Sequence, residues 1–478
     1  MTTTKGTRDF TQGPIFFPML LFTLPIMATG LLQLLYNTAD KVVVGQFAEN
    51  GTVALGAIGC TGSLTSLILA LALGLSMGAG VVVAKRFGAH EERELSRAVH
   101  TSFLVGAVVG IFVGAMGAIL APHVLRLMDT PEALHGDATL YMLIICSGMP
   151  ASVLYNFGAS ILRSVGNSKV PLIVLALSGL LNVGFNLLFV CALHMSVAGV
   201  AIATIISQYA SAISVWLVLS RRRDAVRFRI SSLRIDRRML LEIIRIGVPS
   251  ALQSALFGIA NVLLQSSVNG LDNLPTEVNP NAGATVSGNA IGSDMEGYTY
   301  VAMNSYYQAV LTFTGQNVGA HKPDRVRKTL FYGLAQVVIS GLIVSYGCLL
   351  FSDASLFPGG GILSLFLRKG EGAAVLAAAR ERNSIVLTTY FICGIMEVLT
   401  GHLRGRGCSI TPMISSLICS CLMRLLWVWF VFPHAPSLPF LFLCYPISWI
   451  LTNICHLVTS IVLTRNEKRR AAQAVSET

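Results

Sequence analysis

Charged side chains are scarce in this chain of 478 residues, where Asp, Glu, Lys and Arg together make up 12% of the sequence. Soluble domains usually carry about 25% charged residues. Such a low fraction of charged residues argues against a water-soluble globular protein. Hydrophobic residues make up 54%, so the composition indicates that lipid is the main solvent.

The sequence also lacks the patterns that hold metals or carry catalysis. Its ten cysteines lie almost wholly within apolar runs and form no CxxC or Cys/His spacing, so neither a zinc site nor a disulfide framework is predicted. Residues 90–94 read HEERE and miss the HExxH pattern at its last position, and neither a GxSxG nor a Walker motif occurs. We therefore expect no enzyme, no cofactor and no bound metal.

The chain does contain many apolar runs long enough to cross a bilayer, which takes about 20 residues. We predict an all-α polytopic membrane protein with twelve transmembrane helices. The expected spans lie near 14–46, 53–84, 99–121, 138–162, 171–193, 197–220, 240–269, 286–319, 329–351, 383–402, 411–432 and 437–463. The first run is too long for a cleavable signal peptide and lacks a small-residue cleavage site, so we expect none.

Most of the net charge of +11 lies on alternate loops. Basic clusters at 85–97, 163–169, 221–238, 322–328, 404–406 and 465–470 fall on one side. The other side holds only Lys41, Arg126, Arg368, Lys369, Arg380 and Arg382. By the positive-inside rule, we expect a multi-pass plasma-membrane protein of the bacterial inner-membrane type, with both termini cytoplasmic and the insertion 269–289 outside. This placement argues against nucleic-acid binding.

An internal duplication organises the chain. Gly88-Ala89-His90 recurs as Gly319-Ala320-His321, each at the end of a span and before a charged segment. A second set, Leu162-Arg163, Gly166, Ser168 and Pro171, recurs in the same order as Leu403-Arg404, Gly407, Ser409 and Pro412. We predict two six-helix lobes at 1–219 and 240–465, a basic cytoplasmic linker at 220–239 and a tail at 466–478. Parallel repeats of this kind are typical of two-lobed transporters.

Polar residues within the spans are the candidates for function, because an ionisable residue at membrane depth costs about 2.5–3.5 kcal/mol. Gln33, Asn37 and Asp40 form one stripe on the first helix, at i, i+4 and i+7. Asp40 could instead be a solvated carboxylate beside Lys41. Ser178, Asn182 and Asn186 follow one another at i+4 spacing on the fifth helix, either as a partner face or as helix-to-helix hydrogen bonds.

Several segments together resemble the multidrug and toxic compound extrusion (MATE) family. The resemblance spans roughly residues 14–465 and rests on Leu24-Pro25, Gln33, Leu35-Tyr36-Asn37, Asp40, Val44-Gly45, LRSVGNSKVP (162–171), Glu296-Gly297 and Thr314-Gly315-Gln316-Asn317. It implies a two-lobed exporter that expels drugs and other amphipathic, often cationic compounds in exchange for protons or sodium ions.

The resemblance also implies site residues. Asp40 matches the family's first-helix acidic position, and Glu296 lies in a second-half motif, so we expect these two to couple the ion. Asn186 stands where many proton-coupled members have aspartate. Phe257 replaces a glutamate of the sodium-coupled branch, which favours protons over sodium. The expected polar cavity residues are Gln33, Tyr36, Asn37, Asn182, Asn186 and Glu397.

The expected function is therefore a proton-driven antiporter, acting as a monomer on small molecules within membrane lipid. The alternatives are a dedicated metabolite exporter and a lipid-linked oligosaccharide flippase. A flippase usually needs more helices or a wide cationic cavity, and from the sequence we place only Arg245 and Arg424 clearly within the membrane.

Overall fold

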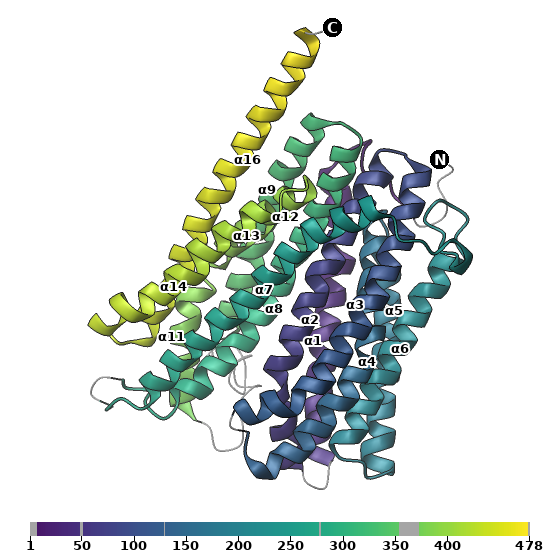
Figure 1. Cartoon of the computed structure of the whole chain (residues 1–478). Coiled ribbons are helices and arrows are strands. Elements are labelled where there is room, and N and C mark those ends of the chain that lie inside the picture. The colour runs from purple at the N-terminus through teal and green to yellow at the C-terminus, as the bar shows by residue number, and fades with distance from the viewer. Residues whose placement is uncertain (1–6, 48–50, 129, 277–278, 353–371, 477–478) are drawn as a thin grey trace. The chain divides into compact units, whose positions relative to one another are not determined.

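The computed structural model describes residues 7–47, 51–128, 130–276, 279–352 and 372–476, and every regular element in these ranges is a helix (Figure 1). The longer helices are α1 (Phe16–Phe47), α2 (Gly51–Gly88), α3 (Glu92–Leu127), α4 (Glu132–Ser164), α5 (Lys169–Asn186), α6 (Val197–Ser220), α7 (Arg237–Asp272), α8 (Thr285–Gly319), α9 (Pro323–Ser352), α11 (Ala373–Val386), α12 (Tyr390–Gly405) and α16 (Cys444–Ser476). The shorter ones are α13 (Ile410–Ser416), α14 (Met423–Leu426) and α15 (Leu438–Phe442), and π-helical turns extend α5 over Leu187–Ala192 and adjoin α14 over Leu417–Leu422 and Trp427–Val431.

Ten of the described helical segments are long and apolar enough to cross a membrane, and a bent pair brings the number to eleven. The pair is α11 and α12, which meet at 49° and replace the single predicted span 383–402. The helix begins earlier than the hydropathy indicated because charged residues before 383 lie inside it. α8 has 35 residues but a more polar sequence. The prediction of an all-helical polytopic chain is confirmed.

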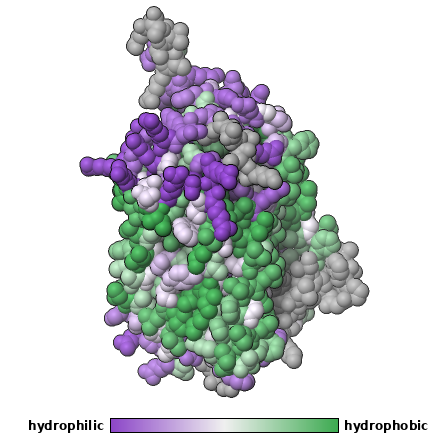
Figure 2. Space-filling model, turned by 90° about the vertical axis from the view of Figure 1, so that its right-hand side faces the viewer, coloured by the Kyte–Doolittle hydropathy of each residue, from purple (hydrophilic) through white to green (hydrophobic). Residues whose placement is uncertain are grey.

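Large apolar side chains point outward along the spans. On α3, Ile111 and Phe112 are each 62% exposed, and on α5 Leu177 is 64% exposed. Figure 2 shows hydrophobic residues covering the middle of one face, with hydrophilic residues gathered at its ends. Soluble monomers rarely expose apolar patches larger than a few hundred Å², so this is the surface expected in contact with lipid.

The chain forms two compact units. Unit 1 comprises Met1–Ala255 and Thr312–Val326, and unit 2 comprises Leu256–Leu311 and Arg327–Thr478. The long helices α7 and α8 therefore change unit part-way along their length, and α9 does so after its first turn. The predicted lobes, 1–219 and 240–465, are defined by the sequence repeat, and their boundaries differ from those of the two units. The lobe boundaries stay a prediction.

Glycines allow α3 and α4 of unit 1 to approach closely. Gly106, Gly110, Gly114 and Gly117 recur at helical spacing on α3 and face α4. A Cβ added at Gly110 would lie 2.8 Å from the Cα of Pro150, and one at Gly114 would lie 2.7 Å from the carbonyl oxygen of Cys146. In lipid, helices associate through such small-residue contacts, so this stripe fixes the centre of unit 1.

The backbone repeats itself where the sequence does. His90 and His321 both adopt the left-handed conformation, with φ of 58° and 54°, and Gly166 and Gly407 do so with φ of 82° and 89°. Within unit 1, the ends of α2 and α8 also cross in a reciprocal way. A Cβ at Gly88 would lie 1.9 Å from the carbonyl oxygen of Gln316, and one at Gly319 would lie 1.9 Å from that of Lys85.

The end of α8 also holds the N-terminal segment. The Phe10 ring stacks on Phe313 with centroids 3.8 Å apart, and the Phe10 N–H donates to Gln316 Oε1 at 2.8 Å. The Arg325 guanidinium donates to the carbonyl oxygens of Phe10 at 2.9 Å and Gly13 at 2.8 Å. The segment before α1 is thus fixed to unit 1 by residues some 300 positions later in the sequence.

Candidate functional site

The first polar site lies in unit 1 where α1 meets α5. Asn186 is fully buried at the end of α5, and its Nδ2 donates to Asp40 Oδ1 of α1 at 2.5 Å. Thr204 of α6 lies beside the Asp40 carboxylate, and its hydroxyl donates to the carbonyl oxygen of Val200 at 2.9 Å. Asp40 is half-buried, so neutral side chains from two other helices lie next to this one carboxylate.

The amides of α5 extend this site by one helical turn. Asn186 Nδ2 also donates to Asn182 Oδ1 at 3.3 Å, and Asn182 Nδ2 donates to Thr204 Oγ1 at 3.4 Å. The Asn186 Oδ1 atom is buried and accepts no hydrogen bond from the described residues. A buried carbonyl without a donor is costly, so this oxygen is ready to accept a proton donor or a cation.

Tyr36 fixes the α1–α5 contact one turn before Asp40. Its hydroxyl donates to the carbonyl oxygen of Ala176 at 3.1 Å. Its ring occupies the space beside Gly179, where an added Cβ would lie 1.9 Å from ring atoms. Glycine at this position of α5 therefore lets the tyrosine ring, and with it Asp40, lie against the helix.

The structure does not bring the rest of the predicted first-helix stripe into this site. Gln33 and Asn37 are exposed, and neither side chain hydrogen-bonds another described residue. The Lys41 side chain, the alternative partner of Asp40, lies outside the described residues. Thr204 escaped prediction because a single hydroxyl in the apolar run 197–206 gives no periodic signal.

The second polar site lies in unit 2 and is built around Arg382 of α11. Arg382 is 1% exposed, and its Nη2 pairs with Glu296 Oε2 of α8. Its Nε donates to Asn289 Oδ1 at 2.9 Å, and its guanidinium lies 4.8 Å from the centroid of the Phe442 ring. The Tyr390 hydroxyl donates to the other Glu296 oxygen at 3.3 Å. Glu296 is thus an ion-paired carboxylate.

Glu397 of α12 is the other predicted carboxylate of this unit. Arg404 acts on it electrostatically, and Tyr300 and Asn304 of α8 lie beside it. Arg404 is 5% exposed and donates to the Tyr307 hydroxyl at 2.7 Å.

The structure corrects the sequence-based account of the arginines. Arg382 and Arg404 are buried in unit 2 together with Arg424, whereas the sequence placed Arg382 in an outer loop and only Arg245 and Arg424 clearly in the membrane. The Arg424 guanidinium lies 4.0 Å from the Tyr445 ring centroid and 5.9 Å from that of Phe257. Arginine and aromatic rings therefore surround the position where the sodium-coupled branch is expected to carry glutamate.

The sequence profile of the MatE family matches residues 25–188 and 258–430, more than half of the chain. The chain belongs to the MatE family. The two matched ranges contain Asp40, Asn186, Glu296, Arg382 and Glu397. Its architecture is accordingly that of a two-lobed, multi-pass membrane transporter.

Individual proteins agree with this MatE assignment. YoeA of Bacillus subtilis, described as a probable multidrug resistance protein, is 25% identical over 418 residues, with 86% of each chain covered. A FAD transporter of Shewanella oneidensis is 23% identical over 362 residues, covering 74% of this chain and 76% of its own. The outward-facing structure of a multidrug resistance MATE transporter superposes with a TM-score of 0.85 at 20% identity, covering 98% of this chain and 100% of its own.

The two sites of this MatE chain can do different chemistry. Among the described residues, no group of three or more His, Cys, Asp or Glu could hold a metal ion. The first site offers oxygens from Asp40, Asn182, Asn186 and Thr204, which suit a proton or a hard monovalent cation. The second combines carboxylates with buried arginines, which suits fixed charge pairs or an anionic group.

Proposed function

We propose that this MatE transporter is a secondary active exporter that moves amphipathic, often cationic small molecules outward in exchange for protons. The observation that carries the proposal is the 2.5 Å contact between Asn186 Nδ2 and Asp40 Oδ1. This contact holds the Asp40 carboxylate within a predicted span. The partners of Asp40 among the described residues are all uncharged. Such a group can gain or lose a proton without leaving an unpaired cation behind.

Asn186 supports both protonation states of Asp40. An amide carries two donors on its nitrogen and an acceptor oxygen. The N–H donates to ionised Asp40, while the unpaired Oδ1 can accept the O–H of protonated Asp40 once the amide turns over by about half a turn, which exchanges its nitrogen and its oxygen. This lowers the free-energy cost of protonating or deprotonating Asp40. A proton-driven transporter needs such a group, because a bound proton shifts the conformational equilibrium only if its affinity differs between the two conformations.

The basic loops support the proposed orientation. In unit 1, the linker is held against α3: the Arg229 N–H donates to His100 Nε2 at 3.1 Å, and the Asp236 N–H donates to Thr101 Oγ1 at 3.1 Å. In unit 2, Arg406 pairs with Glu467 of the tail at 2.8 Å. We propose that these basic ends are cytoplasmic, with both termini inside, and that the monomer is the transporting form.

A second candidate substrate class is an anionic metabolite. The FAD transporter of Shewanella oneidensis is a relative, and the buried Arg382, Arg404 and Arg424 supply positive charge in unit 2. This charge would favour a phosphate-bearing molecule over a cation. The first candidate keeps priority because Glu296 and Glu397 offset part of that charge.

The deciding experiment uses sealed vesicles that contain the purified protein, with pH and sodium gradients imposed separately. We expect a pH gradient alone to drive ethidium movement and a sodium gradient alone to have no effect. Movement of FAD but not of ethidium would replace the cationic substrate class by the anionic one. Transport that needs only sodium, or no gradient, would refute proton coupling.

A further inference from the structure

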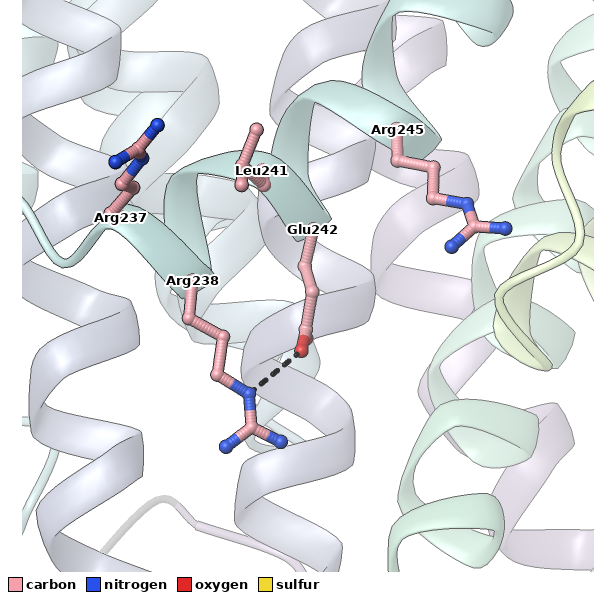
Figure 3. A pocket seen from close by; sticks show the side chains of 5 residues that line it. All are labelled: Arg237, Arg238, Leu241, Glu242 and Arg245. Atoms are coloured by element: carbon pink, nitrogen blue, oxygen red, sulfur yellow. Dashed lines mark ion pairs between the residues drawn. The ribbon is translucent and has the colours of Figure 1, made fainter.

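Three arginines of one helix border an open cavity near the start of α7, and their guanidinium groups extend in different directions (Figure 3). The cavity measures about 470 Å³ and is lined by Arg237, Arg238, Leu241, Glu242 and Arg245 (Figure 3). All five residues belong to unit 1. Neither the polar sites nor the proposed transport uses them, and the sequence singled out Arg245 without giving it a role.

The cavity carries net positive charge. Its one carboxylate, Glu242, is already engaged by Arg86 of α2 at 2.9 Å, and Arg238 lies 3.6 Å from it, the contact drawn in Figure 3. Arg237 and Arg245 are exposed and make no ion pair with any described residue. Two guanidinium groups are therefore available to an anion.

The same face of α7 continues as an apolar stripe. Leu241, Val248 and Leu252 are 57%, 39% and 46% exposed and recur at helical spacing beyond the first arginines. Arg245 lies among them, roughly 12 Å along the helix from Arg237 at about 1.5 Å per residue. An exposed arginine in an apolar stripe places its long stem along hydrocarbon and extends its charged end toward the headgroups.

We propose that this cationic cavity binds the headgroup of an anionic phospholipid, whose acyl chains lie along the apolar stripe of α7. The guanidinium fork matches phosphate oxygens in charge and geometry, and basic cavities at the membrane surface bind anionic lipids in this way. The stripe distinguishes a lipid from a free anion, because free phosphate has nothing to place against Leu241 and Val248.

The test measures lipid binding to the full-length protein by native mass spectrometry, with phosphatidylglycerol, phosphatidylcholine and inorganic phosphate as probes. The site variant is Arg237→Gln/Arg245→Gln. The matched control is Arg221→Gln/Arg223→Gln, which removes the same charge from two exposed arginines of the adjacent linker. A guanidinium that donates to the bound phosphate contributes about fivefold in affinity, at about 1 kcal/mol, whereas Arg221 and Arg223 do not line the cavity.

We expect phosphatidylglycerol to bind more tightly than phosphatidylcholine, the site variant to lose roughly 30-fold for phosphatidylglycerol and the control less than threefold. Equal losses in both variants would mean that only bulk charge attracts lipid, and would overturn the site. If inorganic phosphate displaces phosphatidylglycerol completely, the lipid proposal is wrong and the cavity binds a free anion. If the double variant fails to fold, Arg245→Gln is compared with Arg223→Gln by the same measurement, with the same outcomes.

Discussion

Both units place carboxylates among polar side chains inside a helix bundle, but the partners differ in charge. In unit 1, Asp40 accepts a hydrogen bond from the amide of Asn186, and Thr204 lies beside it. In unit 2, Glu296 is paired with the buried guanidinium of Arg382. Removing one charge of such a pair leaves the other uncompensated, so we expect Glu296 to act as a structural ion-pair partner. Asp40 has no such constraint, which makes it the better candidate for a group that changes charge during transport.

The largest loss of transport is expected on substituting Asp40, and this substitution is the strongest test of the difference between the two units. Asp40→Asn keeps the shape and removes the titrating group, so we expect gradient-driven export to fall to background while the protein stays folded and inserted. Uptake into vesicles under a pH gradient measures this. The matched control, Asp324→Asn, alters an exposed carboxylate at the start of α9 and should transport normally. Normal transport by Asp40→Asn would move the coupling site elsewhere, and Glu296 would be tested next.

The fixed charge of unit 2 is tested by removing its cation. Arg382→Gln leaves the half-buried Glu296 without its cation and with the Tyr390 hydroxyl as its remaining donor among the described contacts, and breaking a buried pair costs about 3–5 kcal/mol. The thermal unfolding midpoint in detergent should therefore drop clearly. Arg382→Gln/Glu296→Gln removes both charges and should recover most of the loss. A double variant less stable than the single one would show that the pair is not the source of the effect.

Glu397 should lie between these two extremes. Arg404 acts on its carboxylate electrostatically, and the neutral side chains of Tyr300 and Asn304 lie beside it. We expect Glu397→Gln to slow transport by a few-fold and to reduce stability by about 1–2 kcal/mol, as for one lost hydrogen bond to a charged group. Initial transport rates and the unfolding midpoint measure the two effects. Complete loss of transport would place Glu397 beside Asp40 as a coupling residue.

The smallest effect is expected at Asn186. Asn186→Asp puts a second carboxylate against Asp40, and two carboxylates this close bind a shared proton because both cannot ionise freely. We expect transport to remain within threefold of normal, with more protons taken up per substrate molecule. Proton uptake and substrate efflux measured together give that ratio. An unchanged ratio would mean that position 186 does not contribute to coupling.

Sequence patterns predicted the first site better than the second, for a physical reason. Asn182 and Asn186 stand out because polar residues at i+4 spacing interrupt an apolar helix, and the structure places both beside Asp40. Arg382 gave no such signal, because it directly precedes an apolar run and its charge resembles a loop. Only tertiary contacts with Glu296 and Asn289 explain how the helix can bury it.

The sequence repeat could also be predicted at positions where the backbone conformation requires a particular residue type. The matched glycines at 166 and 407 both lie in the left-handed region, so each copy kept the residue that the turn requires. The exchange of α7 and α8 between units has no local pattern and could not be predicted. Gln33 and Asn37 are exposed and lie outside the described contacts of Asp40, so their place in a polar cavity stays a prediction.

The sharing of α8 has a consequence for biosynthesis. Domains generally fold as units, N-terminal first, while the chain is being made. Unit 1 cannot be completed in this way, because its N-terminal segment is held by Phe313, Gln316 and Arg325, and residues 256–311 of the other unit are synthesised before them. The earliest part of the nascent chain must therefore wait, without its final partners, until about two thirds of the protein has left the ribosome.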